Sequence, residues 1–299
     1  MNKILLTLLF LIGVNVAAEP VELIVPYAPA GSVDTIGRII AEGFRQQGLD
    51  TVVLNKPGGL GVVGTRHVMN SPANGNIMLL TSTTFLFNHL QKIPGADYDL
   101  ENGLSHVGLI GTALNVIYSR RTLQFDNFGV VVKQMQNGAD YTWGTTNLGA
   151  EFTARLIASK ARVDVRIVRY AGSQQAITDL IGGHIDFVID SRASHIASSS
   201  AETNKINLVA TTDVANKYLP GVLTRSWYGI SLPPGADPKL VAHYNSLLNQ
   251  VLQDPKVKTQ LENNHLSVTP EPTKKFVGLI EDEFKIYSPI ASKIINDEK

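Results

Sequence analysis

The sequence predicts an α/β fold of about two lobes. Short apolar runs alternate with helical patterns along most of the chain, which is typical of buried, largely parallel sheets covered by helices. The length of 299 residues exceeds one small domain, because a domain usually holds about 100–200 residues. Hydrophobic residues make up 44% of the chain and charged residues 17%, so we expect a folded protein rather than a disordered one.

Charge and cysteine content exclude several classes of protein. The 26 basic and 26 acidic residues cancel, and the chain has no cysteine. A neutral chain has no long-range field to gather nucleic acid or an anionic membrane surface, so neither is an expected partner. The lack of cysteine excludes thiolate catalysis, disulfides, Cys-ligated zinc and iron–sulfur clusters. An anionic partner must therefore be bound locally, by a few residues.

Residues 1–18 have the pattern of a secretory signal peptide. The cation Lys3 precedes an apolar stretch over residues 4–13, and the small residues Val16 and Ala18 stand just before Glu19. The segment is too short for a membrane span, which needs about 20 apolar residues. We therefore expect an exported, periplasmic protein, in a compartment without a supply of ATP or NAD. A buried N-terminal helix is the alternative.

The elements follow one another in a regular order. We expect strands at residues 21–26, 51–55, 76–81, 107–119, 141–144, 165–170, 185–190, 207–211 and 227–232. We expect helices at residues 35–47, 64–70, 125–137, 150–160, 173–182 and 192–203. From Pro238 onward the chain is helical, over residues 239–253, 256–263 and 273–296. Ligands of such sheets bind at the carboxyl ends of the strands, so the loops after the strands are the candidate site.

The first of these loops runs from Pro26 to Asp34 and leads directly into a helix. Its prolines stiffen the backbone, Gly31 permits a close approach, and Ser32 or Asp34 suits a helix cap. Backbone N–H groups at such a helix start favour a carboxylate or a phosphate. Ordinary strand-to-helix turns use the same residue types, so both interpretations stay open on this pattern alone.

A glycine-rich turn at residues 59–64 matches G-x-G-x-x-G, the pattern of a dinucleotide-binding turn. That pattern also requires an acidic residue about 20 positions later to hold the ribose. Residues 79–84 occupy this place and contain no acid. We interpret the glycines as turn and packing residues, and we expect no cofactor.

Three later loops also carry polar residues. Thr81, Ser82 and Thr84 belong to a run of four hydroxyl residues, which either donate to a polar ligand or cap the next helix. Residues 144–151 repeat the logic of the first loop, so the two loops form a clamp if the lobes close. Asp190 ends a strand, where it either receives a ligand amine or hydroxyl or caps the following helix.

The motifs indicate no enzyme chemistry. The seven histidines form no H-x-x-x-H or H-x-H pair, and no G-x-S-x-G is present. The spacing of His184 and Asp186 is that of alternate residues on one face of a strand. We therefore expect neither an enzyme nor a metal site.

Five sequence runs occur together, in the order found in one family. They are L-I-V-P-Y-A-P-A-G-S-V-D (residues 23–34), N-K-P-G-G-L-G-V-V-G (55–64), S-P-A-N-G (71–75), Y-A-G-S-Q-Q-A-I-T-D-L-I-G-G-H-I-D (170–186) and S-W-Y-G-I (226–230). The chain thereby resembles the periplasmic solute receptors of tripartite tricarboxylate transporters, the Bug or TctC-like proteins. The resemblance extends over almost all of the chain after residue 18 and explains the G-x-G-x-x-G as part of a P-G-G-x-G-x-x-G turn.

The resemblance implies a two-lobed periplasmic-binding-protein (Venus-flytrap) fold, with two crossing strands between the lobes. We expect lobe 1 at residues 19–118 and 229–299, and lobe 2 at residues 119–228. The implied function is that of a monomer that closes on a small organic acid or amino acid and passes it to membrane transporter subunits. A receptor that signals to a sensor kinase is the alternative, which the sequence does not separate from the first.

The resemblance also implies the binding residues. The first loop would hold one carboxylate, partly through ordered water, and the amides of the middle loop would hold the other end of the ligand. Carried over position by position, the first-loop residues are Ala28, Ala30, Gly31, Ser32 and Asp34. Those in the other lobe are Thr145, Thr146, Asn147, Leu148 and Gly149, with Tyr170, Gly172 and Asp190 behind them.

The chain departs from the family pattern in three places. Ala30 stands where glycine is usual, which restricts the backbone. The segment before Ser226 is shorter than in relatives, which concerns the outer surface of the second lobe and its docking to a transporter. In the middle loop, a Ser/Gly-rich stretch ending in His is replaced by residues 145–150 and Glu151.

An anionic Glu151 near the site has consequences for the ligand. It would repel a second carboxylate by about 1–4 kcal/mol at ~4 Å. We therefore hypothesise a monoacid, or an amino acid whose amine meets Glu151 or Asp190, rather than citrate. The alternative is that Glu151 only favours the N-terminus of its own helix.

Overall fold

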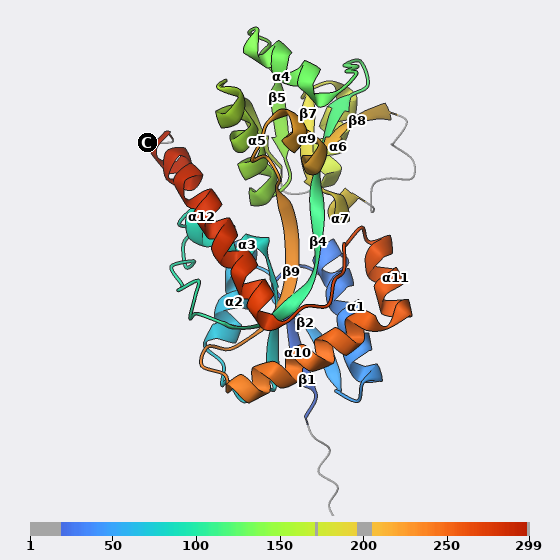
Figure 1. Ribbon diagram of the computed structural model, residues 1–299, viewed down its shortest axis with the longest axis vertical. Coiled ribbons are helices and arrows are strands. Elements are labelled where there is room, and N and C mark those ends of the chain that lie inside the picture. Colours follow the sequence, from blue (N-terminus) through green and yellow to red (C-terminus); the bar gives the residue numbers. More distant parts are fainter. Residues whose placement is uncertain (1–18, 171–172, 196–204, 298–299) are drawn as a thin grey trace, which may run out of the picture.

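The structure, a computed structural model, describes residues 19–170, 173–195 and 205–297. It has two halves, stacked along its longest axis and joined by two strands that run through the waist (Figure 1). The predicted signal peptide at residues 1–18, the predicted site residue Gly172 and most of the helix predicted at residues 192–203 lie outside the described residues.

The strands and helices alternate as the sequence predicts. The strands are β1 (Val21–Val25), β2 (Thr51–Asn55), β3 (Ile77–Ser82), β4 (Ser105–Arg120), β5 (Thr142–Thr145), β6 (Arg166–Arg169), β7 (Phe187–Ser191), β8 (Ile206–Thr211) and β9 (Arg225–Leu232). The helices are α1 (Ser32–Gln46), η1 (Gly59–Gly61), α2 (Val62–Met69), α3 (Thr83–Leu90), α4 (Phe128–Gln136), α5 (Leu148–Ala161), α6 (Ser173–Gly182), α7 (Arg192–His195), α9 (Thr212–Tyr218), α10 (Pro238–Gln253), α11 (Pro255–Asn263) and α12 (Thr273–Asp297).

The long strand β4 is shared by both halves. Its first part pairs with β9, from Ser105 opposite Leu232 to Leu114 opposite Arg225. Its last part pairs with β7 and β8 instead. The strand order β2-β1-β3-β9-β4-β7-β5-β6 therefore passes from one half to the other through β4, with β8 attached to it at the side. The two crossing strands expected between the lobes are β9 and β4 (Figure 1).

The pairing fixes the direction of every strand. Because β3 and β4 are both antiparallel to β9, the parallel set β1, β2 and β3 runs in the same direction as β4. Because β7 is antiparallel to β4, the parallel set β5, β6 and β7 runs in the opposite direction. The carboxyl ends of both sets therefore face each other across the waist. The prediction of parallel sheets holds within each set, whereas β4 and β9 make the sheet as a whole mixed.

The half that contains β1, β2 and β3, here called the lower half, has helices on both faces of its strands. The side chains of β1 point alternately into the two cores between them. Leu23 and Val25 pack in one core with Ile40 of α1 and Leu248 of α10, whereas Ile24 packs in a second core with α2 and α3. All four of these β1 and α1 side chains are fully buried. Apolar side chains on both faces of a strand are what a sheet covered by helices requires.

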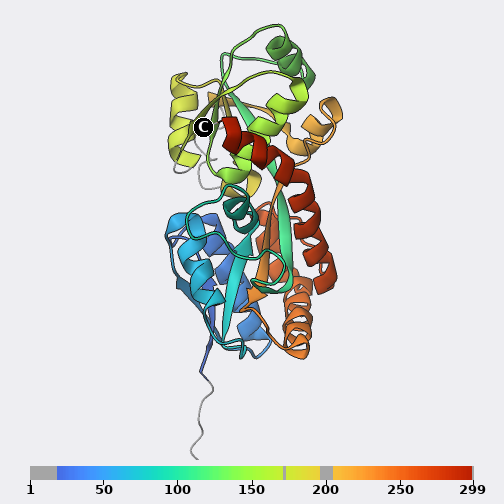
Figure 2. The same cartoon turned by 90° about the vertical axis from the view of Figure 1, so that its left-hand side faces the viewer.

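Helix α12 contacts both halves of the molecule (Figure 2). Its residues Phe276, Ile280 and Tyr287 belong to a core that also contains Phe87 of α3 and Phe152 of α5. The Phe87 and Phe152 rings stack with their centroids 4.6 Å apart. The C-terminal helix thus packs on elements from both predicted lobes, and the boundaries of those lobes stay a prediction.

Some element boundaries have local causes. The helix predicted from residue 125 begins at Phe128, because the Asn127 side chain accepts a hydrogen bond from the Val130 N–H. The helices α3 and α9 were not predicted. In α3 almost every side chain is buried, so the sequence lacks the one-sided apolar pattern of a surface helix.

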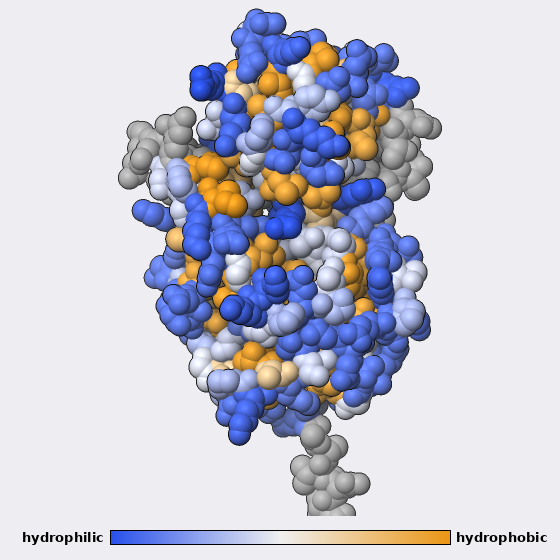
Figure 3. All heavy atoms as spheres, viewed as in Figure 1, coloured by the Kyte–Doolittle hydropathy of each residue, from blue (hydrophilic) through white to orange (hydrophobic). Residues whose placement is uncertain are grey.

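The surface is mixed in character. On the face shown in Figure 3, hydrophilic residues surround scattered hydrophobic patches. In the described ranges, no helix combines the length and the apolar composition needed to cross a bilayer.

Glu283 of α12 is a buried carboxyl in contact with the crossing strand β9. Its Oε2 accepts a hydrogen bond from Nε1–H of Trp227 at 2.7 Å, and Nε of Arg225 lies 3.7 Å from Oε1. Burial raises the pKa of Glu283 from 4.5 to about 7, because these partners only partly replace the lost water. Since the pKa is raised in the folded state, this group's contribution to stability is lost as pH rises between these two values.

We expect Glu283→Gln to remove this pH dependence, because the amide oxygen still accepts from Trp227 and carries no charge. At pH 8 the variant should be more stable than the wild type by about 1–3 kcal/mol, and near pH 4.5 the difference should nearly vanish. Urea unfolding of both proteins across this range measures it. A difference that stays constant with pH would contradict the assignment.

Candidate functional site

A cavity of about 880 Å³ lies where the carboxyl ends of the two strand sets meet. Its walls come from the loops after β1, β2, β3, β5, β6 and β7, and from β9. Most predicted site residues line it: Ala28, Ala30, Gly31, Ser32, Ser82, Thr84, Thr145, Thr146, Asn147, Leu148, Gly149, Glu151, Tyr170 and Asp190. Asp34 and Thr81 do not, and Gly172 lies outside the described residues.

Four helices begin at the cavity wall. The first residues of α1, α3, α5 and α6, which are Ser32, Thr83, Leu148 and Ser173, all line it. The first turn of a helix has backbone N–H groups without helical acceptors, and it forms the positive end of the helix dipole. The first two helices belong to one half and the last two to the other. The described lining has one basic side chain, Arg169, so most of its attraction for an anion comes from the backbone.

The first loop keeps its backbone N–H groups available. Gly31, the residue before α1, is extended, and no side chain caps the helix. Ala30 adopts a positive φ of 67°, which L-residues seldom adopt. The Ala30 N–H donates to Oδ2 of Asp34 at 3.0 Å, which holds the loop in this shape.

Asp34 organises this loop rather than lining the cavity. Its Oδ2 also accepts from Nε of Arg38 at 2.9 Å, and its Oδ1 accepts from Nδ2 of Asn55 at 2.9 Å. Burial alone would raise the pKa of Asp34, but the bonds from Arg38 and Asn55 hold it below its ordinary value. The predicted ligand contact at Asp34 is thus replaced by a positioning role.

The four hydroxyl residues 81–84 span the end of β3 and the start of α3, and only some of them line the cavity. Thr81 is buried and donates to Oγ of Ser231 at 2.7 Å, so it belongs to the interior of the lower half. Ser82 and Thr84 line the cavity, as predicted. Thr83, which was not singled out, also lines it, and its Oγ1 accepts from the Trp227 N–H at 2.6 Å. This hydrogen bond joins the start of α3 to the crossing strand β9 at the cavity wall.

The middle loop repeats the arrangement of the first in the other half. Oδ1 of Asn147 accepts from the Ala150 N–H at 2.9 Å and so caps α5. Gly149 lies against the ring of Phe87, since a Cβ there would stand 3.2 Å from that ring. The N-terminus of α5 therefore meets α3 of the other half closely, at the back of the cavity.

The expectation of an uncompensated negative charge at Glu151 is wrong. Its side chain is 2% exposed, and both oxygens accept from arginines. Oε2 accepts from Nε of Arg169 at 2.7 Å, and Oε1 accepts from Nη2 of Arg169 at 2.7 Å and from Nε of Arg155 at 3.0 Å. Burial acts to raise the pKa of Glu151, but the two arginines keep it below its ordinary value. Two cations around one carboxylate leave this wall positive, so the argument against a second ligand carboxylate fails.

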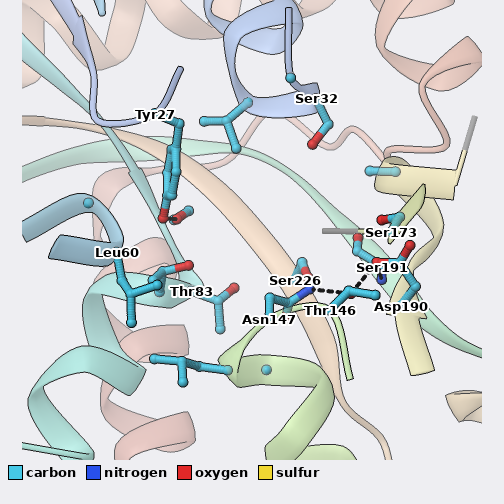
Figure 4. Close-up of a pocket in the computed structure, with 18 of the residues that line it drawn as sticks. Tyr27, Ser32, Leu60, Thr83, Thr146, Asn147, Ser173, Asp190, Ser191 and Ser226 are labelled. Carbon is cyan, nitrogen blue, oxygen red and sulfur yellow. Dashed lines mark hydrogen bonds between the residues drawn. The ribbon is translucent and has the colours of Figure 1, made fainter. Parts of the chain in front are cut away.

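Asp190 differs from Glu151 in having no basic partner among the residues that the structure describes. It is 1% exposed, and its Oδ1 accepts from the Thr146 hydroxyl at 2.7 Å and the Ser191 N–H at 2.8 Å. Burial raises its pKa to about 6, which the hydroxyls of Ser173 and Thr146 only partly offset. Figure 4 shows this polar group on one side of the cavity, with Tyr27 and Leu60 on the other.

Several lining residues were missed from the sequence. They include Tyr27, Leu60, Phe87, Arg169, Ser191, Ser226 and Tyr228. Ser226 and Tyr228 stand in the S-W-Y-G-I run, so their motif was noticed although their position was not. No pattern points to Arg169, whose place follows from the parallel pairing of β5 and β6.

No cluster of metal-ligating side chains forms in the parts of the chain that the structure covers. The lining of the cavity consists of hydrogen-bond donors, two acidic groups and an apolar wall. Such a lining can hold a small anion between the two halves of this α/β fold.

Residues 36–295 match the model of one family, the tripartite tricarboxylate transporter family receptor (TctC). The chain belongs to this family, whose members are periplasmic substrate-binding receptors rather than enzymes. BugT of Bordetella pertussis is 26% identical to it over 294 residues, which span 91% of this chain and 88% of BugT.

Two solved structures share the fold. A periplasmic transporter superposes with a TM-score of 0.77 at 21% identity, covering 92% of this chain and 97% of its own. MatC from Rhodopseudomonas palustris, solved with bound malate, superposes with a TM-score of 0.75 at 19% identity, covering 91% of this chain and 98% of its own. The predicted two-lobed fold and the predicted family are confirmed.

We expect Glu151→Gln to destabilise the protein at pH 7 by about 1–2 kcal/mol, because it leaves Arg155 and Arg169 without their carboxylate. The loss is moderate because Arg169 is exposed and water weakens its ion pair. The pKa of Glu151 is depressed in the folded state, so this contribution is present above its ordinary value of 4.5 and is lost as pH falls further. Urea unfolding at pH 7 and pH 3 measures it.

Glu281→Gln is the matched control, because Glu281 is an exposed residue of α12 and the substitution changes net charge equally. The two variants should differ at pH 7, and the difference should be smaller at pH 3. Equal stability of both variants at pH 7 would show that the arginine pair contributes nothing.

Proposed function

We propose that the protein is a periplasmic solute receptor that captures a small organic carboxylate between its two lobes and delivers it to a tripartite tricarboxylate-type membrane transporter. The ligand is a mono- or dicarboxylic acid or an amino acid. The observation that carries this proposal is the convergence of four helix N-termini, two from each half, on one cavity.

The chemistry of the cavity supports a carboxylate with an aliphatic body. Helix N-termini bind anions with backbone N–H groups, which is how a chain without net charge attracts one. Leu60, Phe87 and Leu148 supply an apolar wall beside them. MatC, which shares the fold, holds malate.

The proposed lobes are residues 19–118 with 229–299 and residues 119–228, which exchange at the crossing strands. A ligand that contacts helix starts in both lobes draws them together, because each lobe alone offers only part of the shell. The closed form is what a membrane partner distinguishes from the empty one.

The proposed periplasmic location rests on the signal-peptide pattern of residues 1–18 and on the family. The proposed role requires no chemical conversion, so bound ligand should be recovered unchanged.

The backbone N–H of Ser32 offers the sharpest test. We expect Ser32→Pro to weaken carboxylate binding at least about tenfold, because a hydrogen bond to a charged group contributes about 1.5–3 kcal/mol. Proline is tolerated at the first position of a helix, and the extended Gly31 before it suits a following proline. The binding partner is found first by thermal shift over a panel of carboxylates, where ligand at 100 times Kd adds about 2.7 kcal/mol.

Ser32→Ala is the control, because it removes the hydroxyl and keeps the N–H. Calorimetry with the strongest acid of the panel should show the large loss in the proline variant alone. Unchanged affinity in a folded Ser32→Pro protein would rule out the helix start as the anion site. A panel without any stabilising acid would refute the proposed function.

A further inference from the structure

Asp190 places an unsatisfied carboxylate oxygen at the cavity wall. The residue lines the cavity and is 1% exposed. Its Oδ1 is bonded to Thr146 and Ser191, as Figure 4 shows, whereas its Oδ2 has no hydrogen-bond partner among the described residues. The neighbouring hydroxyl of Ser191 is likewise buried without a partner at full hydrogen-bond geometry, and the Tyr228 phenol is the group that approaches it. Buried polar groups are nearly always bonded, so two adjacent exceptions at a binding cavity call for a ligand group.

The two acidic residues of the wall are treated differently by the fold. Glu151 is neutralised by Arg155 and Arg169, which come from its own helix and from β6. In the described ranges, no such cation is paired with Asp190. A buried carboxylate without a counter-charge is unfavourable for folding alone, and such a group is retained where it serves a binding partner.

The groups that face Asp190 are hydroxyls and phenols. Thr146 and Ser173 approach from the starts of α5 and α6. Tyr118 on β4 and Tyr228 on β9 also face it. Burial raises the pKa of both phenols, and the nearby charge of Asp190 raises it further, so both stay neutral. Arg192, the next charged residue along the chain, is exposed at the start of α7. None of these supplies the positive charge that an ionised Asp190 lacks.

We propose that the ligand is an amino acid whose protonated amine donates to Oδ2 of Asp190 and to Oγ of Ser191, while helix N-termini hold its carboxylate. This inference rests on the proposed function and names the class of ligand for the same cavity. An ammonium group provides both the missing donor and the missing charge, whereas a hydroxyl provides only a donor. A second carboxylate at this position would face a like charge.

The titration of Asp190 gives the proposal a signature in pH. With a pKa of about 6 in the empty protein, Asp190 is ionised at pH 8 and accepts from an amine. At pH 5 the carboxyl holds a proton and no longer offers a full negative charge. Affinity for an amino acid should therefore rise between pH 5 and pH 8. A dicarboxylate placed against Asp190 would show the opposite trend, because the protonated carboxyl is then a donor.

The experiment compares acids that share a carbon skeleton and differ at one position. Calorimetry at pH 8 is run with alanine, lactate and propionate; with aspartate, malate and succinate; with glutamate, 2-hydroxyglutarate and glutarate; and with 4-aminobutyrate and butyrate. In the set that binds most tightly, we expect the amine to bind at least about tenfold more tightly than the hydroxyl or hydrogen analogue.

The variant Asp190→Asn tests the residue. It keeps an oxygen for Thr146 and Ser191 and removes the charge, so the preference for the amine should fall to about threefold or less while the affinity of the deaminated acid stays or improves. Asp164→Asn, at an exposed residue of the same half, is the matched control and should bind as the wild type does. The ligand-free Asp190→Asn protein should melt at a higher temperature than the wild type at pH 8, which also shows that it folds.

Two results would overturn the inference. One is equal or tighter binding of the hydroxyl or deaminated acid in every set, and the other is an amine preference that survives in Asp190→Asn. If that variant does not fold, the pH trend of wild-type binding decides: affinity for the amino acid that falls from pH 5 to pH 8 contradicts the proposal. If no acid of any set binds, it is the proposed function that fails.

Discussion

The antiparallel pair of β4 and β9 is the constraint on which the rest of the molecule depends. Because β9 is antiparallel to both β3 and β4, the parallel set β1–β3 runs in the same direction as β4, whereas the set β5–β7, which joins β4 through the antiparallel β7, runs against it. The carboxyl ends of the strands, and the helix starts that follow them, then have to meet at the waist. A single continuous strand thus brings the carboxyl ends of two parallel strand sets to one shared cavity.

Three buried carboxyls show how burial is used differently within one fold. Glu151 is matched by two arginines and stays ionised, so it contributes to stability at neutral pH. Glu283 accepts a hydrogen bond from an indole, and burial raises its pKa to about 7. Asp190 has neither a cation nor a donor for its second oxygen in the part of the chain that the structure covers. The first two join elements of the scaffold, and the third leaves its unmet requirement facing the cavity, where a ligand can meet it.

The sequence predicted the fold where the pattern is local. The nine strands lie within about two residues of their predicted ranges, because each is an apolar run between turn residues, short in all but β4. The helices α3 and α9 were missed for local reasons as well, since α3 is buried on nearly all sides and α9 spans only seven residues. The mixed character of the sheet was missed because strand pairing is set by contacts between distant segments, such as β3 with β9.

The same distinction applies to the site. The loops after the strands were predicted correctly as its walls, because strand ends and helix starts are visible in the sequence. The charge state of Glu151 was not, because Arg169 lies on another strand and reaches it only through the pairing of β5 with β6. Asp34 positions the first loop while it is held by hydrogen bonds from Asn55 and Arg38, and no sequence motif links these residues to it.

A bound carboxylate should join helix starts of both halves and so draw the halves together. Because the chain has no cysteine, Val63→Cys on α2 and Gln175→Cys on α6 give two spin labels at exposed positions beside the cavity, one in each half. Pulsed electron resonance should show the distance between them shorten by several ångströms when a carboxylate that binds is added to saturation. An unchanged distance in a sample whose binding has been verified by calorimetry would show that the ligand does not draw the halves together.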